Sequence, residues 1–299
     1  MAAVRGRTPH AHSSFEAIGT HWEVDLFAIL ADSIMAQTQL DALMRRIDQF
    51  DAVYSRFRAD SLISRIAIAP GQYEFPPDAP PLFEIYHRLY ELTDGAMTPL
   101  IGSVIADAGY DATYSLRPKP LQPPPKWDDI MEFQDGRLTT SAPLLLDFGA
   151  AGKGYLLDII KMLLCDDANM PICLDAGGDI VVNGLSEPLR IGLENPDDPS
   201  QVIGVATIAQ GSICGSAGNR RKWAQYTHII NPHSLSSDTD IAAVWVTAQD
   251  GLTADALTTA LYFASPAKLL TVFDFEYAIL KRDHSLQHSP SFPAEFFGA

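Results

Sequence analysis

The sequence is poor in positive charge and in cysteine. It holds 21 lysines and arginines against 37 aspartates and glutamates, for a formal net charge of -16 at pH 7. A nucleic-acid surface needs clustered basic residues, so this balance argues against nucleic acid as a partner. The three cysteines form no Cys-x-x-Cys pair, and their odd number leaves no closed set of disulfides. We therefore expect reduced, mostly buried thiols.

The sequence also lacks a long apolar run and a secretion signal. No segment approaches the roughly 18 consecutive apolar residues of a membrane-spanning helix, so no membrane insertion is expected. Residues 1–10 contain two arginines and a proline but no apolar stretch typical of a signal peptide. On this basis we expect a cytoplasmic protein.

Two common nucleotide-binding motifs are missing as well. A P-loop would need a glycine five residues before Gly152 and a serine or threonine after Lys153, but Asp147 and Gly154 occupy those places. The triplet Asp-Phe-Gly at 147–149 is found in kinases, yet no His-Arg-Asp catalytic loop precedes it. Neither family fits the chain.

The sequence does contain enough apolar material for a large core, since 47% of its 299 residues are hydrophobic. Residues 1–14 lack periodicity and are predicted to form a disordered tail. Residues 15–299 are predicted to form a single domain, with two lobes as an alternative. Within this domain, residues 112–137 hold five prolines and few branched aliphatic residues, which predicts a surface excursion.

Hydrophobic periodicity predicts a mixture of strands and helices. Apolar residues alternate over 20–27, as in a half-buried strand, and recur every three or four residues over 33–54 and 80–92, as in helices. Further strands are predicted at 190–194, 202–208, 226–230, 242–247 and 276–281, and further helices at 255–263 and 267–273. Many consecutive strands with helices grouped between them predict an α+β fold.

Residues 144–158 are the stretch around which the chain is organised. The apolar residues 144–146 predict a short buried strand, residues 149–154 a tight turn, and the residues from Tyr155 onward a helix. Backbone amides at such a helix start attract anions, and Lys153 adds a positive charge, so the stretch is a candidate phosphate cradle. An ordinary strand-to-helix turn with a solvated lysine explains it equally well.

Two other stretches have an open interpretation. Residues 172–182 read as a strand interrupted by Gly177 and Gly178, which indicates either a bulge approached by a ligand or a hairpin turn. Closely spaced basic residues and serines at 55–65 are typical of a solvated loop.

Candidate chemistry also lies near the C-terminus. If residues 252–262 are helical, Asp255 and Thr259 lie on one face and offer the oxygen ligands that suit Mg²⁺; the alternative is that Asp255 caps the helix start. His228 lies in an apolar strand before a proline turn. As a neutral imidazole it could accept a proton, and otherwise it is a hydrogen-bonded core histidine.

Taken together, these stretches resemble, in order, the motifs of the ApbE family of FAD:protein FMN transferases. The resemblance spans about residues 15–282, nearly the whole chain. Its elements are Ile-Gly-Thr at 18–20, Ser-Arg-Phe-Arg-Ala-Asp-Ser at 55–61, Thr-Asp-Gly-Ala-Met-Thr-Pro at 93–99, Asp-Phe-Gly-Ala-Ala-Gly-Lys-Gly-Tyr at 147–155, Asp-Ala-Gly-Gly-Asp at 175–179, His-Ile-Ile-Asn-Pro at 228–232 and Ala-Asp-Ala-Leu-Thr-Thr-Ala at 254–260. Each element is weak alone, but seven in this order make a strong resemblance.

The resemblance implies an α+β fold with a T-fold-like core of antiparallel strands and packed helices. It also implies an enzyme that uses Mg²⁺ and FAD, moves FMN onto a serine or threonine hydroxyl of an acceptor protein with a flavinylation motif, and releases AMP. The implied metal ligands are Asp255, Thr259 and the Ala150 carbonyl. The implied catalytic residues are His228, as general base, and Lys153, which stabilises the pyrophosphate.

The FAD site implied by the resemblance consists of Ile18, Phe57, Ala96, Met97, Thr98, Asp147, Lys153, Gly177 and Gly178. The chain departs from the family pattern, which usually has Met, Tyr, Asp and Gly where this chain has Ile18, Phe57, Thr98 and Leu235. The changes at Thr98 and Leu235 bear on flavin orientation and on the turn that positions the acceptor. Alternatives are therefore an FAD-binding protein or FAD pyrophosphatase without protein flavinylation and, from another class, an interaction protein.

Overall fold

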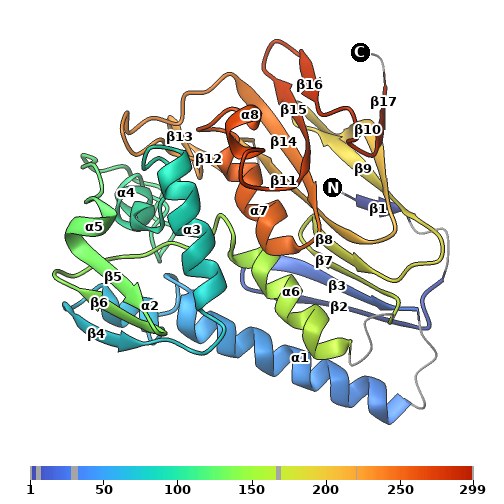
Figure 1. The fold of residues 1–299 in the computed structure, drawn as a ribbon, viewed down its shortest axis with the longest axis horizontal. Helices are drawn as coiled ribbons and strands as arrows, with labels where there is room; N and C mark the ends of the chain where they lie inside the picture. Colours follow the sequence, from blue (N-terminus) through green and yellow to red (C-terminus); the bar gives the residue numbers. More distant parts are fainter. Residues whose placement is uncertain (1, 5–7, 28–32, 166–169, 220, 298–299) are drawn as a thin grey trace.

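The computed structural model describes residues 2–4, 8–27, 33–165, 170–219 and 221–297 (Figure 1). The predicted α+β class is confirmed, since helices pack on sheets whose described strand pairs are all antiparallel. The largest sheet has eight strands in the order β16-β15-β14-β11-β8-β7-β3-β2. These strands are β2 (Ala11–Ala17), β3 (Thr20–Leu26), β7 (Ile172–Ala176), β8 (Asp179–Asn183), β11 (Gly211–Ala217), β14 (Ile241–Ala248), β15 (Glu276–Lys281) and β16 (Leu286–His288).

Three smaller sheets accompany the large one. A four-stranded sheet has the order β1-β9-β10-β17, and a three-stranded sheet has the order β4-β6-β5. The strands β12 and β13 form a two-stranded hairpin. Their bounds are β1 (Ala2–Val4), β9 (Leu189–Asn195), β10 (Asp198–Ile208), β17 (Ala294–Phe296), β4 (Gly71–Glu74), β5 (Met131–Gln134), β6 (Arg137–Thr140), β12 (Lys222–Trp223) and β13 (Tyr226–Thr227).

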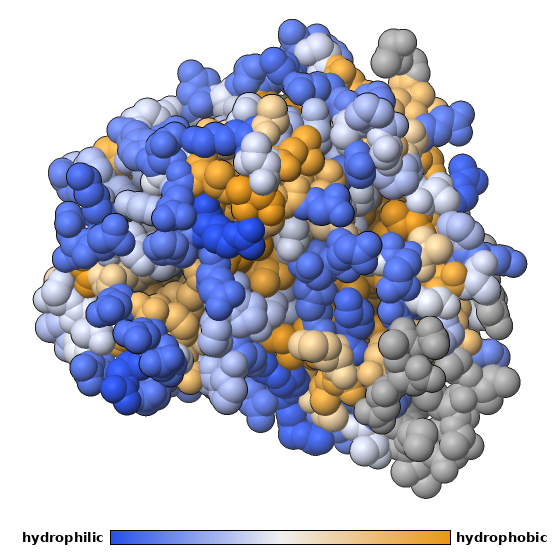
Figure 2. Space-filling view, viewed as in Figure 1, coloured by the Kyte–Doolittle hydropathy of each residue, from blue (hydrophilic) through white to orange (hydrophobic). Residues whose placement is uncertain are grey.

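Helices follow the chain at intervals between these strands. They are α1 (Ser33–Tyr54), α2 (Leu62–Ile66), α3 (Pro80–Leu92), the 3₁₀ helix η1 (Pro99–Ile101), α4 (Gly102–Asp107), α5 (Trp127–Ile130), α6 (Gly152–Leu164), α7 (Gly251–Ala260) and α8 (Pro266–Leu269). Within the described ranges, none of them is long and apolar enough to cross a membrane. Figure 2 shows that hydrophilic side chains cover most of one face of the molecule, with apolar side chains in smaller patches between them.

The eight-stranded sheet lies between two hydrophobic cores. One face packs against the helices through residues such as Leu156 of α6 and Leu257 of α7. The opposite face packs against the four-stranded sheet through residues such as Ile180 and Ile191. Because both faces are covered, β8 is buried along its whole length and has a continuous apolar run, Ile-Val-Val at 180–182.

Several predicted elements are confirmed. The strand at 20–27 is β3, and the helices at 33–54 and 80–92 are α1 and α3 with the same bounds. Residues 172–182 form the β7–β8 hairpin, in which Ala176 pairs with Asp179 across a two-residue turn. Gly177 and Gly178 have φ values of 67° and 98°, which glycine adopts without strain. The hairpin interpretation of this stretch is therefore correct.

Other predictions are wrong. Residues 2–4 form β1, which pairs with β9, and residues 11–14 belong to β2, which pairs with β3 along its whole length. The predicted tail over 1–14 does not hold at either place; residues 1 and 5–7 of that tail lie outside the described residues. Residues 144–146 are buried in part but form no strand, because the backbone amides of Leu144 and Asp147 donate to the carbonyls of Ile66 and Pro99 in other segments.

Several predicted segments are shorter than expected. The helices predicted at 255–263 and 267–273 end at Ala260 and Leu269. The proline-rich excursion has no regular structure over 112–126, where prolines lack the N–H that a strand or helix needs, but its last part contains α5 and β5. The strand expected at 226–230 covers only residues 226–227, as β13.

Candidate active site

A cavity of about 680 Å³ lies where the loops and helix starts meet the large sheet. Its lining comes from the β2–β3 turn, the loop after α1, the loop before η1, the starts of α6 and β8, the end of β11, and α7. All of the predicted site residues except Gly178 line it, namely Ile18, Phe57, Ala96, Met97, Thr98, Asp147, Ala150, Lys153, Gly177, His228, Asp255 and Thr259. Gly178 is the next residue along the chain from Gly177.

One wall of this cavity, here called the helix wall, consists of Ala150, Lys153, Asp179, Asp255 and Thr259. It depends on a very close approach of α6 to α7. A Cβ atom added at Gly154 would lie 2.0 Å from the Gly251 carbonyl oxygen, and one at Gly251 would lie 2.4 Å from the Gly154 carbonyl oxygen. Only glycines permit this approach, which brings the start of α6 beside Asp255.

The carboxylate of Asp158 fixes the same two helices further along α6. It accepts hydrogen bonds from the backbone amides of Gly251, at 2.9 Å, and Leu252, at 2.8 Å. These two amides have no acceptor within α7 because they lie in its first turn, where a negative charge is also favourable. Burial nevertheless raises the pKa of Asp158 to about 6, against the lowering effect of the two hydrogen bonds.

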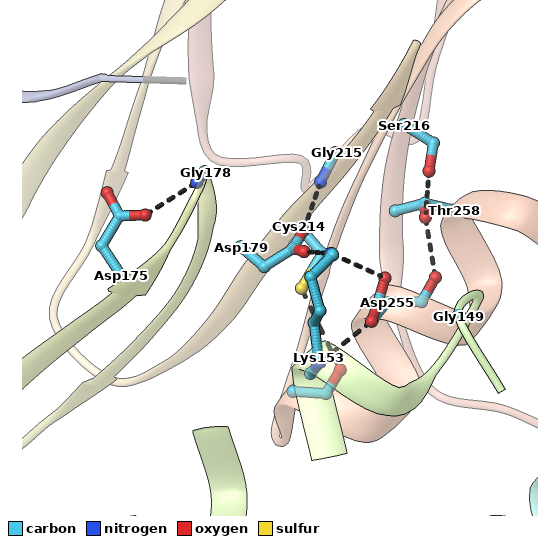
Figure 3. A network of polar contacts seen from close by, with 12 residues as sticks. Gly149, Lys153, Asp175, Gly178, Asp179, Cys214, Gly215, Ser216, Asp255 and Thr258 are labelled. Atoms are coloured by element: carbon cyan, nitrogen blue, oxygen red, sulfur yellow. Dashed lines mark hydrogen bonds and ion pairs between the residues drawn. The ribbon is translucent and has the colours of Figure 1, made fainter. Parts of the chain in front are cut away.

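The Asp255 side chain is held within the helix wall, with 4% of the residue exposed. Its Oδ2 accepts from the Gly154 amide at 2.9 Å, and its Oδ1 lies 3.8 Å from Lys153 Nζ (Figure 3). The alternative that Asp255 caps its helix is wrong, because the cap of α7 is Asp250, which accepts from the Thr253 amide at 2.7 Å.

The donor atoms of this wall are those of a carboxylate, a hydroxyl and a backbone carbonyl. Among the described residues there is no group of three or more His, Cys, Asp or Glu side chains that could hold a metal. A single anchored carboxylate with hydroxyl and carbonyl oxygens nearby is nevertheless a donor set that Mg²⁺ accepts, because Mg²⁺ keeps several waters and substrate phosphates in its shell. Asp255, Thr259 and Ala150 line one cavity, so the donor types that this cavity offers are compatible with the ion.

Asp179 is part of the helix wall and was not assigned a role from the sequence. Its Oδ2 forms an ion pair with Lys153 Nζ, and its Oδ1 accepts a 3.4 Å hydrogen bond from the Gly215 amide (Figure 3). Only 2% of the residue is exposed. The sequence offered one signal, the place of Asp179 at the end of the Asp-Ala-Gly-Gly-Asp motif. Its ion-pair partner Lys153 lies 26 residues away, so the contact itself could not be predicted.

His228 borders the cavity from the segment after β13. Its Nδ1 is buried and has no hydrogen-bond partner in the part of the chain that the structure describes. Burial, with the positive charges of Arg221 and Lys153, lowers the pKa of His228 to about 4. The imidazole is therefore neutral at pH 7 and can accept a proton.

Another part of the lining, here called the loop wall, consists of Arg56, Phe57, Tyr110 and Tyr114. The Phe57 ring stacks on Tyr114 with centroids 5.3 Å apart and meets Tyr110 edge-on at 5.4 Å. The Arg56 guanidinium lies 4.1 Å from the centre of the Phe57 ring. Aromatic faces and guanidinium planes of this kind suit a flat ring system.

Arg56 connects the loop wall to the loop before α6. Its Nε donates to Asp147 Oδ2 at 2.5 Å and its Nη1 to the Tyr110 carbonyl at 2.7 Å. Asp147 Oδ1 in turn accepts from the Gly149 amide at 2.7 Å. The solvated loop predicted at 55–65 is thus wrong for Arg56, whose side chain is only 3% exposed, and for residues 62–65, which belong to α2. Arg56, Tyr110, Tyr114 and Arg221 were all missed from the sequence.

The two consequential departures from the family pattern have defined local structures. Thr98 caps η1 by accepting from the Leu100 amide at 3.2 Å, a role that threonine and aspartate side chains both fill. Leu235 has a φ of 54°, in the left-handed region that favours glycine, and its amide donates to the Asn231 carbonyl at 2.8 Å. The turn therefore keeps a glycine-type backbone, at a conformational cost of about 1 to 2 kcal/mol.

Comparison with known proteins places this geometry in a wider context. Among solved structures, the chain is similar to the flavin transferase ApbE from Vibrio cholerae, with a TM-score of 0.79 and 19% identity over 94% of this chain and 97% of that one. It is also similar to the ApbE protein of Thermotoga maritima, with a TM-score of 0.80 and 21% identity over 95% and 99%. These likenesses concern the fold.

Curated sequences give a consistent result. A protein of Rhodobacter capsulatus named FAD:protein FMN transferase is 25% identical, over 86% of this chain but 52% of its own length. One of Klebsiella pneumoniae with the same name is 22% identical over 85% of this chain and 78% of its own length. The chain thus spans about half of the first relative. The sequence model of the ApbE family matches residues 18–279, so the chain belongs to the ApbE family.

Proposed function

We propose that this protein transfers the FMN part of FAD to a serine or threonine hydroxyl of an acceptor protein, with Mg²⁺ as cofactor and AMP as the second product. One observation carries the proposal: Lys153, Asp255, Thr259 and His228, from distant parts of the chain, line one cavity of about 680 Å³ in a member of the ApbE family. Two relatives carry the name FAD:protein FMN transferase.

The helix wall suits the diphosphate of FAD. Asp255, Thr259 and the Ala150 carbonyl would hold Mg²⁺, which supplies neutralising charge to the diphosphate when bound. Lys153 adds a positive charge at the start of α6, where the positive end of the helix dipole also favours an anion. This wall therefore binds and orients the group that is cleaved.

The loop wall suits the flat ring system of the flavin. Phe57 and Tyr114 offer aromatic faces at one side of the cavity, Arg56 lies over the Phe57 ring, and Arg221 lies over the neighbouring Tyr110 ring. Stacking on such faces contributes about 1 kcal/mol per aromatic contact beyond the burial of apolar area. With the flavin against this wall and the diphosphate at the other, FAD would span the cavity.

His228 is the residue that would accept the proton of the incoming hydroxyl. The acceptor oxygen forms a bond to the phosphorus of the FMN phosphate, and the bond from that phosphorus to the oxygen of AMP breaks. The hydroxyl proton goes to the neutral His228 imidazole, and AMP leaves with the electron pair of the broken bond. A pKa of about 4 keeps this imidazole unprotonated over the neutral range.

Incubation with FAD, Mg²⁺ and an acceptor protein that carries a flavinylation motif tests the proposal. We expect in-gel flavin fluorescence on the acceptor, with AMP released in equal amount. AMP without a labelled acceptor would instead support FAD hydrolysis, which the departures at Thr98 and Leu235 make the second candidate. A protein that binds no FAD would contradict both functions.

A further inference from the structure

The helix wall contains a buried group of three charges that do not balance. Lys153 lies between Asp179 and Asp255, whose side chains are 3% and 5% exposed, while the lysine side chain is 26% exposed (Figure 3). Two buried carboxylates thus share one ammonium group. Buried carboxylates are costly unless they are paired or bind a cation, so one negative charge in this group needs a further positive partner.

The Lys153 ammonium lies closer to one of the two carboxylates than to the other. Its Nζ is in direct contact with Asp179 Oδ2, whereas its distance to Asp255 Oδ1 is 3.8 Å, too long for a hydrogen bond. Asp255 Oδ1 is therefore the oxygen that remains open toward the cavity, and its partner oxygen is already bound to the Gly154 amide.

Asp179 is well placed to hold the lysine in this position. It begins β8, next to the two-residue glycine turn, and β8 lies inside the eight-stranded sheet between β7 and β11. Its second oxygen accepts from the Gly215 amide of β11. A carboxylate fixed by two neighbouring strands gives the flexible lysine one preferred partner.

We propose that Asp179 is a positioning residue that keeps the Lys153 ammonium away from Asp255, so that the Asp255 carboxylate stays open to Mg²⁺. Without Asp179, the ammonium would have one carboxylate left within reach and would compete with the metal ion for it. This inference rests on the proposed function, because it takes Asp255 as the metal ligand.

A titration with Mn²⁺ in the absence of FAD tests the inference. The EPR signal of the free ion measures how much Mn²⁺ is bound. Mn²⁺ prefers the same oxygen ligands as Mg²⁺. We expect Asp179→Asn to weaken Mn²⁺ binding about tenfold or more, as for other residues that act through a metal ligand. The double variant Asp179→Asn/Lys153→Met should bind Mn²⁺ as tightly as Lys153→Met alone, because it has lost the competing ammonium.

Lys161→Met is a matched control. Lys161 is also on α6 and lies 3.7 Å from a carboxylate oxygen, that of Asp158, but it does not line the cavity. Its removal should leave Mn²⁺ affinity unchanged. If Asp179→Asn is too unstable to measure, the Lys153→Met variant provides the test. It should bind Mn²⁺ at least as tightly as the wild type. Weaker Mn²⁺ binding would overturn the inference.

The outcomes separate this inference from the proposed function. Unchanged Mn²⁺ affinity in Asp179→Asn, or a double variant that binds as weakly as Asp179→Asn, would overturn the positioning role and leave the proposed function standing. A wild type that binds no Mn²⁺, or an Asp255→Asn variant that binds it normally, would contradict the metal site itself and with it both proposals.

Discussion

The helix wall and the loop wall of the cavity reach the same space by different means. The helix wall is built on regular elements that touch backbone to backbone at Gly154 and Gly251, with each carboxylate held by a backbone amide. The loop wall is built on aromatic rings in irregular segments, and Tyr114 is 51% exposed. We infer that the fold and the proposed metal site share residues in the helix wall, whereas the aromatic side chains of Phe57 and Tyr114 in the loop wall contribute little to stability.

Gly154→Ala should cause the largest loss of stability. The new methyl group would lie 2.0 Å from the Gly251 carbonyl oxygen, so α6 and α7 must separate, at a cost of about 3 kcal/mol in the free energy of unfolding. Urea denaturation measures it. Gly152→Ala is the control, because its nearest contacts would be 3.9 Å away and its stability should stay within about 1 kcal/mol of wild type. Equal stability of the two variants would show that the close contact is not needed.

His228→Gln should lower the rate of FMN transfer about 100-fold or more, which is the usual contribution of a general base. FAD affinity and the melting temperature should stay close to wild type, since the residue borders the cavity without a hydrogen-bonded ring Nδ1. Because the pKa of His228 is lowered to about 4, its protonation should leave the wild-type rate unaffected between about pH 5.5 and 8 and reduce it as the pH falls through about 4. Loss of FAD binding in the variant would make His228 a structural residue.

Asp158→Asn should change how stability depends on pH. Burial raises the folded-state pKa of Asp158 from 3.8 to about 6, so the folded protein binds this proton more tightly than the unfolded chain does. The cost of the buried charge is therefore absent below about pH 4 and grows as the pH rises to about 6. Between pH 4 and 7 the wild type should lose about 2 kcal/mol of stability relative to the variant. A pH-independent difference in denaturant midpoints would contradict this account.

Phe57→Ala should have the smallest effect, on FAD affinity alone. Losing one stacked ring weakens binding about fivefold to tenfold, with little change in the melting temperature. Fluorescence titration with FAD measures it. Phe15→Ala is the control, because Phe15 stacks on Trp22, outside the cavity, and its loss should leave FAD affinity unchanged. A large loss of stability in Phe57→Ala would remove the distinction between the two walls.

Much of the helix wall could be predicted from the sequence because its glycines, lysine and carboxylates occur in short motifs. Lys153, Asp255 and Thr259 could be predicted as site residues for this reason, and all three line the cavity. The contacts between these motifs could not be predicted. Lys153 pairs with Asp179 and Arg56 with Asp147 across 26 and 91 residues, distances over which local patterns carry no information.

The loop wall and two segments of backbone were harder to predict for different reasons. Tyr110 lies just before the proline-rich excursion and Tyr114 within it, in a segment where no periodicity marks burial. Residues 144–146 are apolar because they are partly buried, but periodicity reports burial and not strand pairing, and the amide of Leu144 bonds to Ile66 instead. The strand β2 was missed because every second residue along it is exposed and several are polar.

FAD binding measured with and without Mg²⁺ tests the central claim, that the helix wall holds a metal ion against the diphosphate of FAD. Flavin fluorescence titrations should be carried out on the wild type and on Asp255→Asn. We expect Mg²⁺ to tighten FAD binding to the wild type about tenfold or more and to have no effect on the variant. FAD affinity that does not respond to Mg²⁺ in the wild type, or that responds equally in Asp255→Asn, would contradict the claim.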